Sequence, residues 1–306
     1  MPGPAPGVTP VNDGERGPLY TLHTRPDDLR DPVLAVHLEG WIDAGSAGAG
    51  AMNALRNSLD TTLVASFHVD HLLDQRARRP FVRVADGVNT GLDWPKIELH
   101  WARDHDGRDL LLLAGPEPDY QWRTFARDVR DLGKDLGVRL MVGLGAFPSP
   151  LPHTRPCPLV CTATTAQLAQ EIGFMPGTFD VPAGIEAVLE QGFAGAGVPA
   201  VGLWARVPHY LAAQPYPVAS LALVEALARL GGLELDLSAL RQAAAETRER
   251  LDLLVAADPR VTGLVEALEA QVDAEASTSL AAGFGDLPTG DEIAAELERF
   301  LRDQGS

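Results

Sequence analysis

Cysteine is scarce in this sequence, because only Cys157 and Cys161 occur among its 306 residues. Their spacing on a predicted strand places both side chains on one face, and we interpret them as a reduced, half-buried pair. Two thiols without further cysteines, and without a suitably spaced pair of histidines, do not make a convincing zinc site. The sequence therefore predicts no bound metal and indicates no cofactor.

Basic residues are also few. The chain has 25 Lys and Arg residues against 42 Asp and Glu residues, and its formal charge is −17. Binding to nucleic acid or to an anionic membrane depends on clustered Lys and Arg side chains. We therefore expect no nucleic-acid partner and no membrane partner.

Long apolar runs are the third absence. No stretch approaches the roughly 18 apolar residues that mark a membrane-spanning helix. The segment from Met1 to Pro18 is rich in Pro and Gly but has neither a basic start nor an apolar run, so it does not resemble a signal peptide. We expect residues 1–18 to be a disordered leader and the protein to be cytoplasmic.

The sequence does contain the material of a folded domain. Hydrophobic residues make up 45% of it and charged residues 22%, which is ordinary for a globular protein. The first pattern is a buried strand over Pro32–Leu38, a Gly-rich turn, a helix over Ser46–Leu59 and a strand over Thr62–Phe67. This order predicts a βαβ crossover with parallel pairing.

Strands and helices continue to alternate up to about residue 231. A turn at Asp106-Gly107 predicts a hairpin between two apolar segments. The alternation predicts an α/β core domain over residues 19–231, with a three-layer sheet carrying helices on both faces. The remaining expected strands lie at about 81–84, 97–101, 109–113, 138–144, 159–162 and 201–205, and the expected helices at about 119–136 and near Ala166 and Glu186.

Residues 232–306 show only helical periodicity. From residue 231 onward there are sixteen acidic residues against six basic ones, which suits solvated helix faces. We expect this region to be a helical appendage with a flexible linker over residues 274–288. A last short helix is expected to begin near Asp291.

The Gly-rich turn after the first strand is the most informative local feature. It holds Gly40, Trp41, Asp43 and Gly45. Backbone N–H groups at a helix start can bind an anion, which would make the turn one wall of a ligand crevice. The turn lacks the Lys-Ser/Thr ending of a phosphate loop, and Asp43 would repel a phosphate, so Asp43 is also interpreted as a helix cap.

A second turn follows the strand at residues 109–113 and contains Glu117 and Asp119. Segments after the carboxyl ends of strands line the ligand crevice of an open α/β sheet. Glu117 is therefore a candidate polar anchor in that crevice, or else it accepts hydrogen bonds from backbone amides at the start of the next helix.

Two further segments complete the candidate site. His153, Thr154 and Arg155 lie between prolines in a donor-rich loop that suits a carboxylate or a phosphate, with an ion pair between Arg155 and Glu117 as the structural alternative. His209 and Tyr210 follow a later strand, where a rigid elbow is the alternative.

These four motifs, taken together and in order, resemble the proteasome-assembly-chaperone family, and most closely its actinobacterial branch. The likeness extends from about Pro32 to Arg302. It implies a fold similar to that of nucleoside phosphorylases, and a non-catalytic assembly role whose details are unknown for most actinobacterial members. Relatives that bind proteasomes often end in a hydrophobic residue, Tyr and one further residue, whereas this sequence ends in Asp303-Gln304-Gly305-Ser306.

We therefore carry two hypotheses forward. The first is an interaction or assembly protein that forms a homo-oligomer, with a trimer as the expected state, and that has a proteasome-related partner. The second is a binding protein or enzyme for a nucleoside- or phosphate-type small molecule. No catalytic constellation is evident, since Ser46 lacks a nucleophile-elbow frame.

Overall fold

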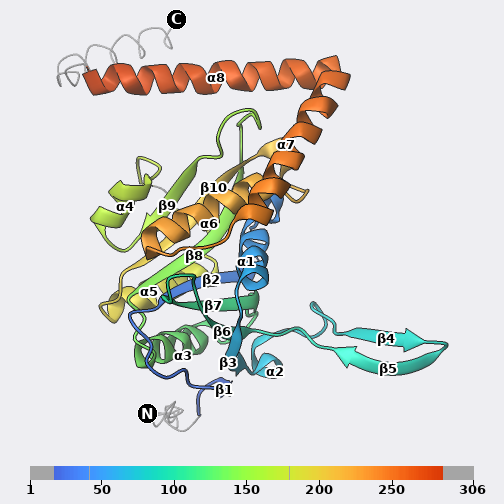
Figure 1. Cartoon of the computed structure of the whole chain (residues 1–306), viewed down its shortest axis with the longest axis vertical. Coiled ribbons are helices and arrows are strands. Elements are labelled where there is room, and N and C mark those ends of the chain that lie inside the picture. Colours follow the sequence, from blue (N-terminus) through green and yellow to red (C-terminus); the bar gives the residue numbers. More distant parts are fainter. Residues whose placement is uncertain (1–16, 41, 179, 285–306) are drawn as a thin grey trace, which may run out of the picture. The chain divides into compact units, whose positions relative to one another are not determined.

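A central eight-stranded sheet organises the larger part of this chain (Figure 1). The computed structural model describes residues 17–40, 42–178 and 180–284. The chain divides into two units, the first made of Met1–Ser149 and Cys157–Arg248 and the second of Pro150–Pro156 and Glu249–Ser306. The sheet belongs to the first unit.

Parallel strands form the middle of the sheet and antiparallel strands its edges. The strand order is β1-β3-β6-β7-β2-β8-β10-β9, with parallel pairs between β7 and β2, β2 and β8, and β8 and β10. This arrangement confirms the predicted α/β class. The strands are β1 (Tyr20–Leu22), β2 (Val33–Glu39), β3 (Thr62–Phe67), β6 (Glu98–Arg103), β7 (Asp109–Pro116), β8 (Leu140–Ser149), β9 (Leu159–Ala163) and β10 (Ala200–Pro208).

The predicted crossover between β2 and β3 is wrong in its pairing. β3 pairs antiparallel with β1 and β6, and it does not neighbour β2. The cause is the hairpin of β6 and β7, which was predicted from its turn and in which Gly107 has a φ of 77°. This hairpin places β7 beside β2 and β6 beside β3, so two strands separate the expected partners.

Helices cover both faces of the sheet, as the sequence predicted. Because side chains alternate along a strand, Leu34, Val36 and Leu38 of β2 face the cluster formed with α3 and α5. His37 faces α1, where its ring lies against Gly48. The helices are α1 (Ala47–Ser58), α3 (Trp122–Asp135), α5 (Ile185–Gly195) and α6 (Pro217–Gly231), with the short α2 (Val69–Leu72), α4 (Ala166–Ile172), η2 (Ala44–Ser46) and η3 (His209–Leu211).

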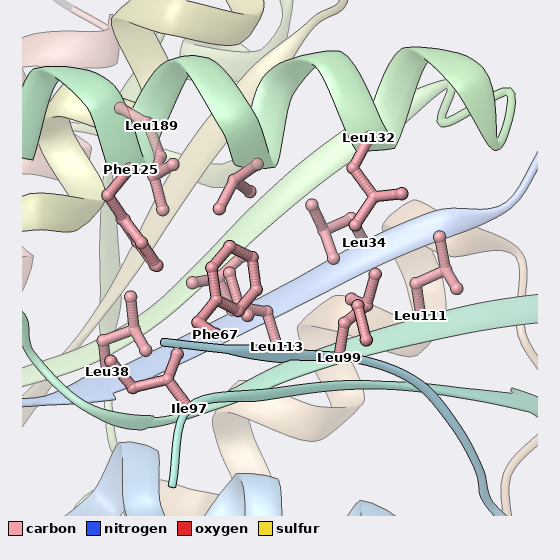
Figure 2. Packing of buried hydrophobic residues seen from close by; sticks show 14 of the residues in the cluster. Leu34, Leu38, Phe67, Ile97, Leu99, Leu111, Leu113, Phe125, Leu132 and Leu189 are labelled. Carbon is pink, nitrogen blue, oxygen red and sulfur yellow. The ribbon is translucent and has the colours of Figure 1, made fainter. Parts of the chain in front are cut away.

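The main hydrophobic core lies between the sheet and helices α3 and α5 (Figure 2). Phe125 of α3 is fully buried and its ring centroid lies 4.9 Å from that of Phe67 on β3. Leu113 of β7 and Leu189 of α5 close the same cluster. Burying one such side chain contributes about 1.5–3 kcal/mol, so this layer holds the strand ends described below in fixed positions.

A separate two-stranded hairpin, β4 (Phe81–Ala85) and β5 (Val88–Asp93), extends away from the sheet in Figure 1. Its turn is Asp86-Gly87, with φ angles of 49° and 80°. Two positive φ angles in a two-residue loop are typical of a type I′ turn. The sequence analysis expected a strand near residues 81–84 but did not identify this hairpin.

The C-terminal region is helical, as expected. Helix α7 spans Ser238–Ala257 and α8 spans Pro259–Phe284, and the first unit includes α7 up to Arg248. Residues 274–284 belong to α8, so the linker expected at 274–288 is corrected there, because the Ala-rich sequence of this stretch favours a helix. The leader over residues 1–16 and the last helix near Asp291 lie outside the described residues.

Candidate functional site

A narrow crevice lies at the carboxyl ends of β2 and β7 in the first unit. Glu39 of β2 is opposite Pro116 of β7, and the chain turns away after both. The volume of the crevice is about 30 Å³. Its walls include His37, Gly40, Ile42, Asp43, Leu144, Gly145, Glu117, Gly184, Glu186 and Trp204.

Asp43 in the wall of this crevice holds the first turn of α1. Its Oδ1 accepts a hydrogen bond of 2.8 Å from the N–H of Gly48, and its Oδ2 accepts one of 3.0 Å from Ala49. These N–H groups have no partner within the helix, and a carboxylate suits the positive end of the helix dipole. Asp43 therefore occupies the position where an anion would bind.

Glu117 holds the start of a different helix from the one that the sequence suggested. Its Oε1 accepts a 2.7 Å hydrogen bond from the N–H of Ile185, the first residue of α5. Gly40 lies against the same carboxylate, and a Cβ at that position would overlap it. The glycine is therefore required by close approach to Glu117, and the two predicted turns meet in one place.

His37 is a crevice residue that the sequence analysis missed. It is 4% exposed, and its Nδ1 donates a 2.8 Å hydrogen bond to the backbone oxygen of Leu144. Its Nε2 is buried, has no hydrogen-bond partner among the described residues and lies 3.6 Å from Oδ2 of Asp43. The available signal was a single polar residue within an apolar strand.

Glu186 and Glu190, one turn apart on α5, were also missed. Glu186 accepts a 3.1 Å hydrogen bond from the N–H of Leu38, and burial raises its pKa well above the ordinary value, helped by the negative charges of nearby carboxylates. Burial raises the pKa of Glu190 to about 7, although the hydroxyl of Thr162 donates a 3.2 Å hydrogen bond to it. Both carboxyl groups retain protons at pH values where an exposed Glu has lost its own.

The charge of the crevice opposes an anionic ligand. Of the described residues that line it, none is Lys or Arg, whereas three are acidic. Its carboxylates accept hydrogen bonds from the backbones of three separate segments, at Gly48, Ile185 and Leu38. This arrangement joins α1, α5 and β2 around the strand ends.

A wider cleft of about 320 Å³ lies beside the same histidine. It contains two cations, Arg56 and Lys96, together with carboxylates. Arg56 is 3.9 Å from the carboxylate of Glu98, so part of its charge is already balanced. His37 lines both the crevice and this cleft.

Gly45 and Asp119 serve other contacts. Gly45 has a φ of 68°, its N–H donates to the oxygen of Ala212 at 2.7 Å, and its oxygen accepts from the N–H of Tyr216 at 2.8 Å. Asp119 forms an ion pair of 2.6 Å with Arg78 and is not among the residues that line the crevice. Trp41 lies outside the described residues.

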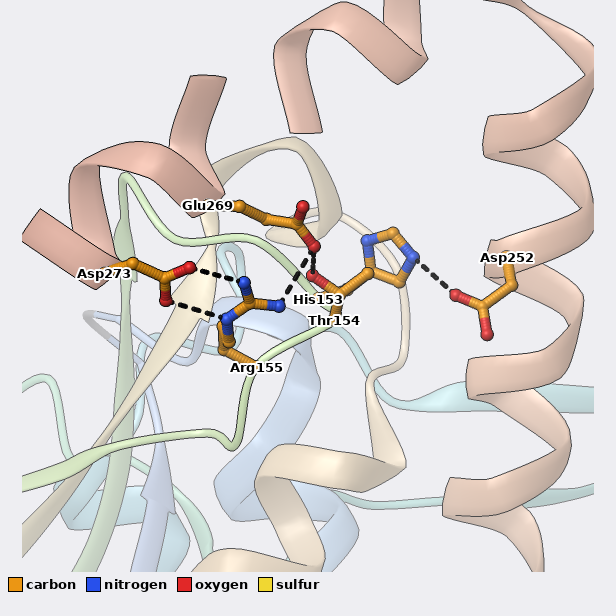
Figure 3. A network of polar contacts seen from close by, with 6 residues as sticks. All are labelled: His153, Thr154, Arg155, Asp252, Glu269 and Asp273. Atoms are coloured by element: carbon orange, nitrogen blue, oxygen red, sulfur yellow. Dashed lines mark hydrogen bonds and ion pairs between the residues drawn. The ribbon is translucent and has the colours of Figure 1, made fainter. Parts of the chain in front are cut away.

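The loop with His153, Thr154 and Arg155 belongs to the second unit, where it contacts carboxylates of the C-terminal helices (Figure 3). Nε2 of His153 is 3.2 Å from Asp252, and Thr154 donates to Glu269. Arg155 contacts Glu269 at 3.1 Å and Asp273 at 2.7 Å, and its hydrogen bonds lower the pKa of Asp273.

The sequence analysis expected this loop to bind a carboxylate or a phosphate. In the structure, carboxylates of the same chain occupy that position. The sequence analysis named Glu117 as the ion-pair partner of Arg155, and this assignment is corrected to Glu269 and Asp273. The reason is that the acidic C-terminal helices, which the sequence showed only as charged, carry carboxylates at the positions that face Arg155.

His209 and Tyr210 belong to η3, which follows β10. Their rings contact each other edge to face, with centroids 5.4 Å apart. Neither residue is among those that line the crevice. The nearby Tyr216 is 3% exposed, so its side chain is part of the core and not of an exposed surface.

Metal and membrane sites receive no support from the part of the chain that is described. Within residues 17–284, apart from the two omitted positions, no group of three or more His, Cys, Asp or Glu side chains is arranged to hold a metal ion. Among the described helices, none combines the length and apolar character needed to cross a bilayer.

Comparison with known proteins identifies similar chains. A family model described as the PAC2 family matches residues 37–255. No functionally curated protein matches the sequence. Among solved structures, the Mycobacterium tuberculosis protein of unknown function Rv2714 has a TM-score of 0.79 and 39% identity, over 87% of this chain and 95% of that one.

Two further structures are informative. A protein of unknown function from Corynebacterium glutamicum has a TM-score of 0.79 and 34% identity, over 84% of this chain and 97% of its own. The Mycobacterium tuberculosis proteasome-assembly chaperone homologue Rv2125 has a TM-score of 0.71 and 32% identity, over 76% of this chain and 99% of its own. The similar chains described here thus come from actinobacteria.

Proposed function

Because this chain belongs to the PAC2 family, we propose that it is a non-catalytic protein that binds and helps to assemble other protein subunits. Because the chain is similar to a proteasome-assembly chaperone homologue, we propose proteasome subunits as its binding partners. We also propose that it associates with itself, with a trimer as the expected state, and that it acts in the cytoplasm.

One observation carries this proposal: the carboxylates of the crevice hold the protein's own backbone. Asp43 binds the start of α1, and Glu117 binds the start of α5. A crevice of about 30 Å³ is far below the roughly 300–1,000 Å³ of small-molecule sites. The polar groups that suggested a binding site therefore support a rigid scaffold, and a rigid scaffold suits protein recognition.

The test is co-expression with actinobacterial proteasome α-subunits, followed by native mass spectrometry. We expect a complex that contains this chain together with α-subunits, and faster appearance of assembled α-rings. As a control, the α-subunits are expressed alone. If no complex forms and ring assembly proceeds at the same rate, a proteasome partner is ruled out.

Small-molecule binding is a second candidate, favoured by the cleft of about 320 Å³ beside His37. Arg56 and Lys96 in that cleft would hold an anionic group, and the buried Nε2 of His37 would accept a hydrogen bond. Thermal-shift measurements with inorganic phosphate and with nucleosides test this idea. We expect any increase in melting temperature to disappear in Lys96→Gln, and no increase with either probe would reject the candidate.

A further inference from the structure

A second cavity, of about 340 Å³, lies at the amino ends of the central strands, whereas the crevice lies at their carboxyl ends. The strands β7, β2 and β8 are neighbours in the sheet and run parallel, so they begin at the same edge (Figure 1). Val33, the first residue of β2, is opposite Leu110 of β7 on one side and Leu140 of β8 on the other. Residues that precede these three strands therefore meet at one place.

An arginine that lines the cavity precedes each of the three strands. Arg108 comes directly before β7, Arg139 comes directly before β8, and Arg30 lies three positions before β2. The whole chain has a formal charge of −17, so three converging arginines reverse the sign of the charge locally. The crevice at the other ends of the same strands has no Lys or Arg among its described lining residues.

The end of α6 holds two of these guanidinium groups in position. Arg139 donates from Nη2 to the backbone oxygen of Gly231 at 2.6 Å, and from Nε to that of Asp31 at 3.0 Å. Nη1 of Arg108 lies 3.3 Å from the place that a Cβ on Gly232 would occupy. Gly232 ends the helix with a φ of 58°, as glycine commonly does. Arginines from two different strands thus flank the same pair of glycines.

Much of the donor capacity of these arginines remains for a ligand. A guanidinium group has five N–H donors, and Arg139 uses two of them for backbone oxygens. The carboxylate of Asp106 is 3.9 Å from Arg108, and both side chains are more than half exposed, so solvent screens this pair. Within the part of the chain that the structure describes, the guanidinium of Arg30 forms no ion pair.

Two carboxylates also line the cavity, and one of them is already balanced. Asp109 is 2% exposed, and it accepts hydrogen bonds from the backbone N–H of Arg30 at 2.8 Å and from Trp101 at 2.9 Å. Its charge is paired with Arg103 at 3.1 Å, which is not among the lining residues. Asp31 is then the single negative charge that opposes three arginines, which leaves a formal charge of +2.

We propose that this cavity, which we call the arginine site, binds a phosphate group. A phosphate monoester carries a charge of about −1.5 to −2 at pH 7 and accepts hydrogen bonds through three oxygens, which matches donors that come from three strands. A carboxylate has a single charge and two oxygens, so it matches the site less well. The cavity volume is within the roughly 300–1,000 Å³ of small-molecule sites. The inference is independent of the proposed assembly role and concerns a different site from the cleft beside His37.

The test titrates the full-length chain with inorganic phosphate, with AMP and with acetate by calorimetry at low salt. We expect phosphate or AMP to bind once per chain and to raise the melting temperature, and acetate to bind at least about tenfold more weakly. Raising the salt concentration to about 0.5 M should weaken phosphate binding, because salt screens the charge attraction. Tighter binding of AMP than of inorganic phosphate identifies a phosphate ester as the ligand, and the opposite order identifies free phosphate.

Substitutions place the ligand within the molecule. Arg30→Gln and Arg108→Gln should each weaken binding at least about tenfold, and since both side chains are exposed, the melting temperatures without ligand should stay close to that of wild type. Asp31→Asn should strengthen binding about two- to fivefold, because it removes the opposing charge while Asn tolerates the φ of 45° at this position. The matched control is Arg123→Gln, which removes an exposed arginine of α3 outside the cavity and should bind as wild type does.

Three results would overturn the proposal. The first is a wild type that binds neither phosphate nor AMP at concentrations up to about 10 mM. The second is an equal loss of affinity in Arg123→Gln and Arg30→Gln, which would show a general effect of charge. The third is loss of binding in Lys96→Gln with binding retained in Arg30→Gln, which would assign the phosphate to the cleft beside His37.

Discussion

Glu190 should make the stability of this protein fall as the pH rises through the weakly acidic range. The carboxyl group is 5% exposed on α5 and lies against Gly202 of β10, where a Cβ would overlap it. It accepts a 3.2 Å hydrogen bond from the hydroxyl of Thr162. Burial therefore dominates and raises its pKa to about 7, from an ordinary value of 4.5.

The sign follows from the protons bound in each state. Below about pH 4.5 the carboxyl is protonated in both the folded and the unfolded chain, so it contributes no pH dependence. Between about pH 4.5 and 7 the folded chain keeps the proton that the unfolded chain loses, and the free energy of unfolding therefore decreases with pH. Above about pH 7 both states are ionised and the loss is complete, at about 3 kcal/mol.

Glu190→Gln removes this titration while it keeps the size of the side chain. Urea unfolding of both proteins at several pH values between about 4.5 and 8.5 measures the difference in free energy. As the pH rises across that range, the free energy of unfolding of the variant should increase by about 3 kcal/mol relative to that of wild type, and most of this change should occur below about pH 7. Removing the charge should also lower the pKa of Glu186, which Glu190 raises.

The matched control is Glu171→Gln on α4, because Glu171 is exposed. Its stability should follow that of wild type at every pH. A difference between Glu190→Gln and wild type that stays constant within about 0.5 kcal/mol over the whole range would refute the argument that the folded chain protonates Glu190.

Three further predictions concern the same unit. Asp43→Ala should lower the free energy of unfolding by about 1–2 kcal/mol in a urea titration, because two N–H groups of α1 lose their acceptor, and an unchanged midpoint would contradict this. Gly48→Ala should lower the free energy of unfolding by about 2–3 kcal/mol in the same assay, because its Cβ would overlap the backbone oxygen of Leu144. The control is Gly263→Ala, which should not destabilise the protein because no atom lies within 4 Å of the added Cβ. Burial raises the pKa of the Cys157 thiol to about 12, so its labelling by a thiol reagent at pH 8 should be at least about 100-fold slower than in urea, and equal rates would refute that burial.

Some of the fold was readable from short stretches of sequence. The strand over Val33–Glu39 and the helix over Ala47–Ser58 follow from apolar periodicity and a Gly-rich turn, and the hairpin of β6 and β7 follows from Asp106-Gly107. Each of these signals is local, because the residues that set it lie within a few positions of one another.

The pairing of the strands was not readable in this way. The sequence order of β2, α1 and β3 predicted neighbours, yet β7 and β6 lie between the two strands. The hairpin of β4 and β5 was missed although its turn, Asp86-Gly87, is a local signal. The strand at 81–84 was expected, but β5 is exposed along its whole length and contains Gly91, so no buried face marks it as a strand.

The candidate site shows the same division between local and tertiary information. Turn chemistry identified Gly40, Asp43 and Glu117 before their partners were known, and the family motifs were likewise a property of the sequence. Only the tertiary structure placed Glu117 at the start of α5 and brought His37 and Glu186 to the same strand ends. It also placed Glu190 close enough to raise the pKa of Glu186. It also gave Arg155 its carboxylate partners from α8. The physical reason is that a hydrogen bond or a buried charge depends on atoms 68 to 148 positions apart in the chain, and no local pattern records that distance.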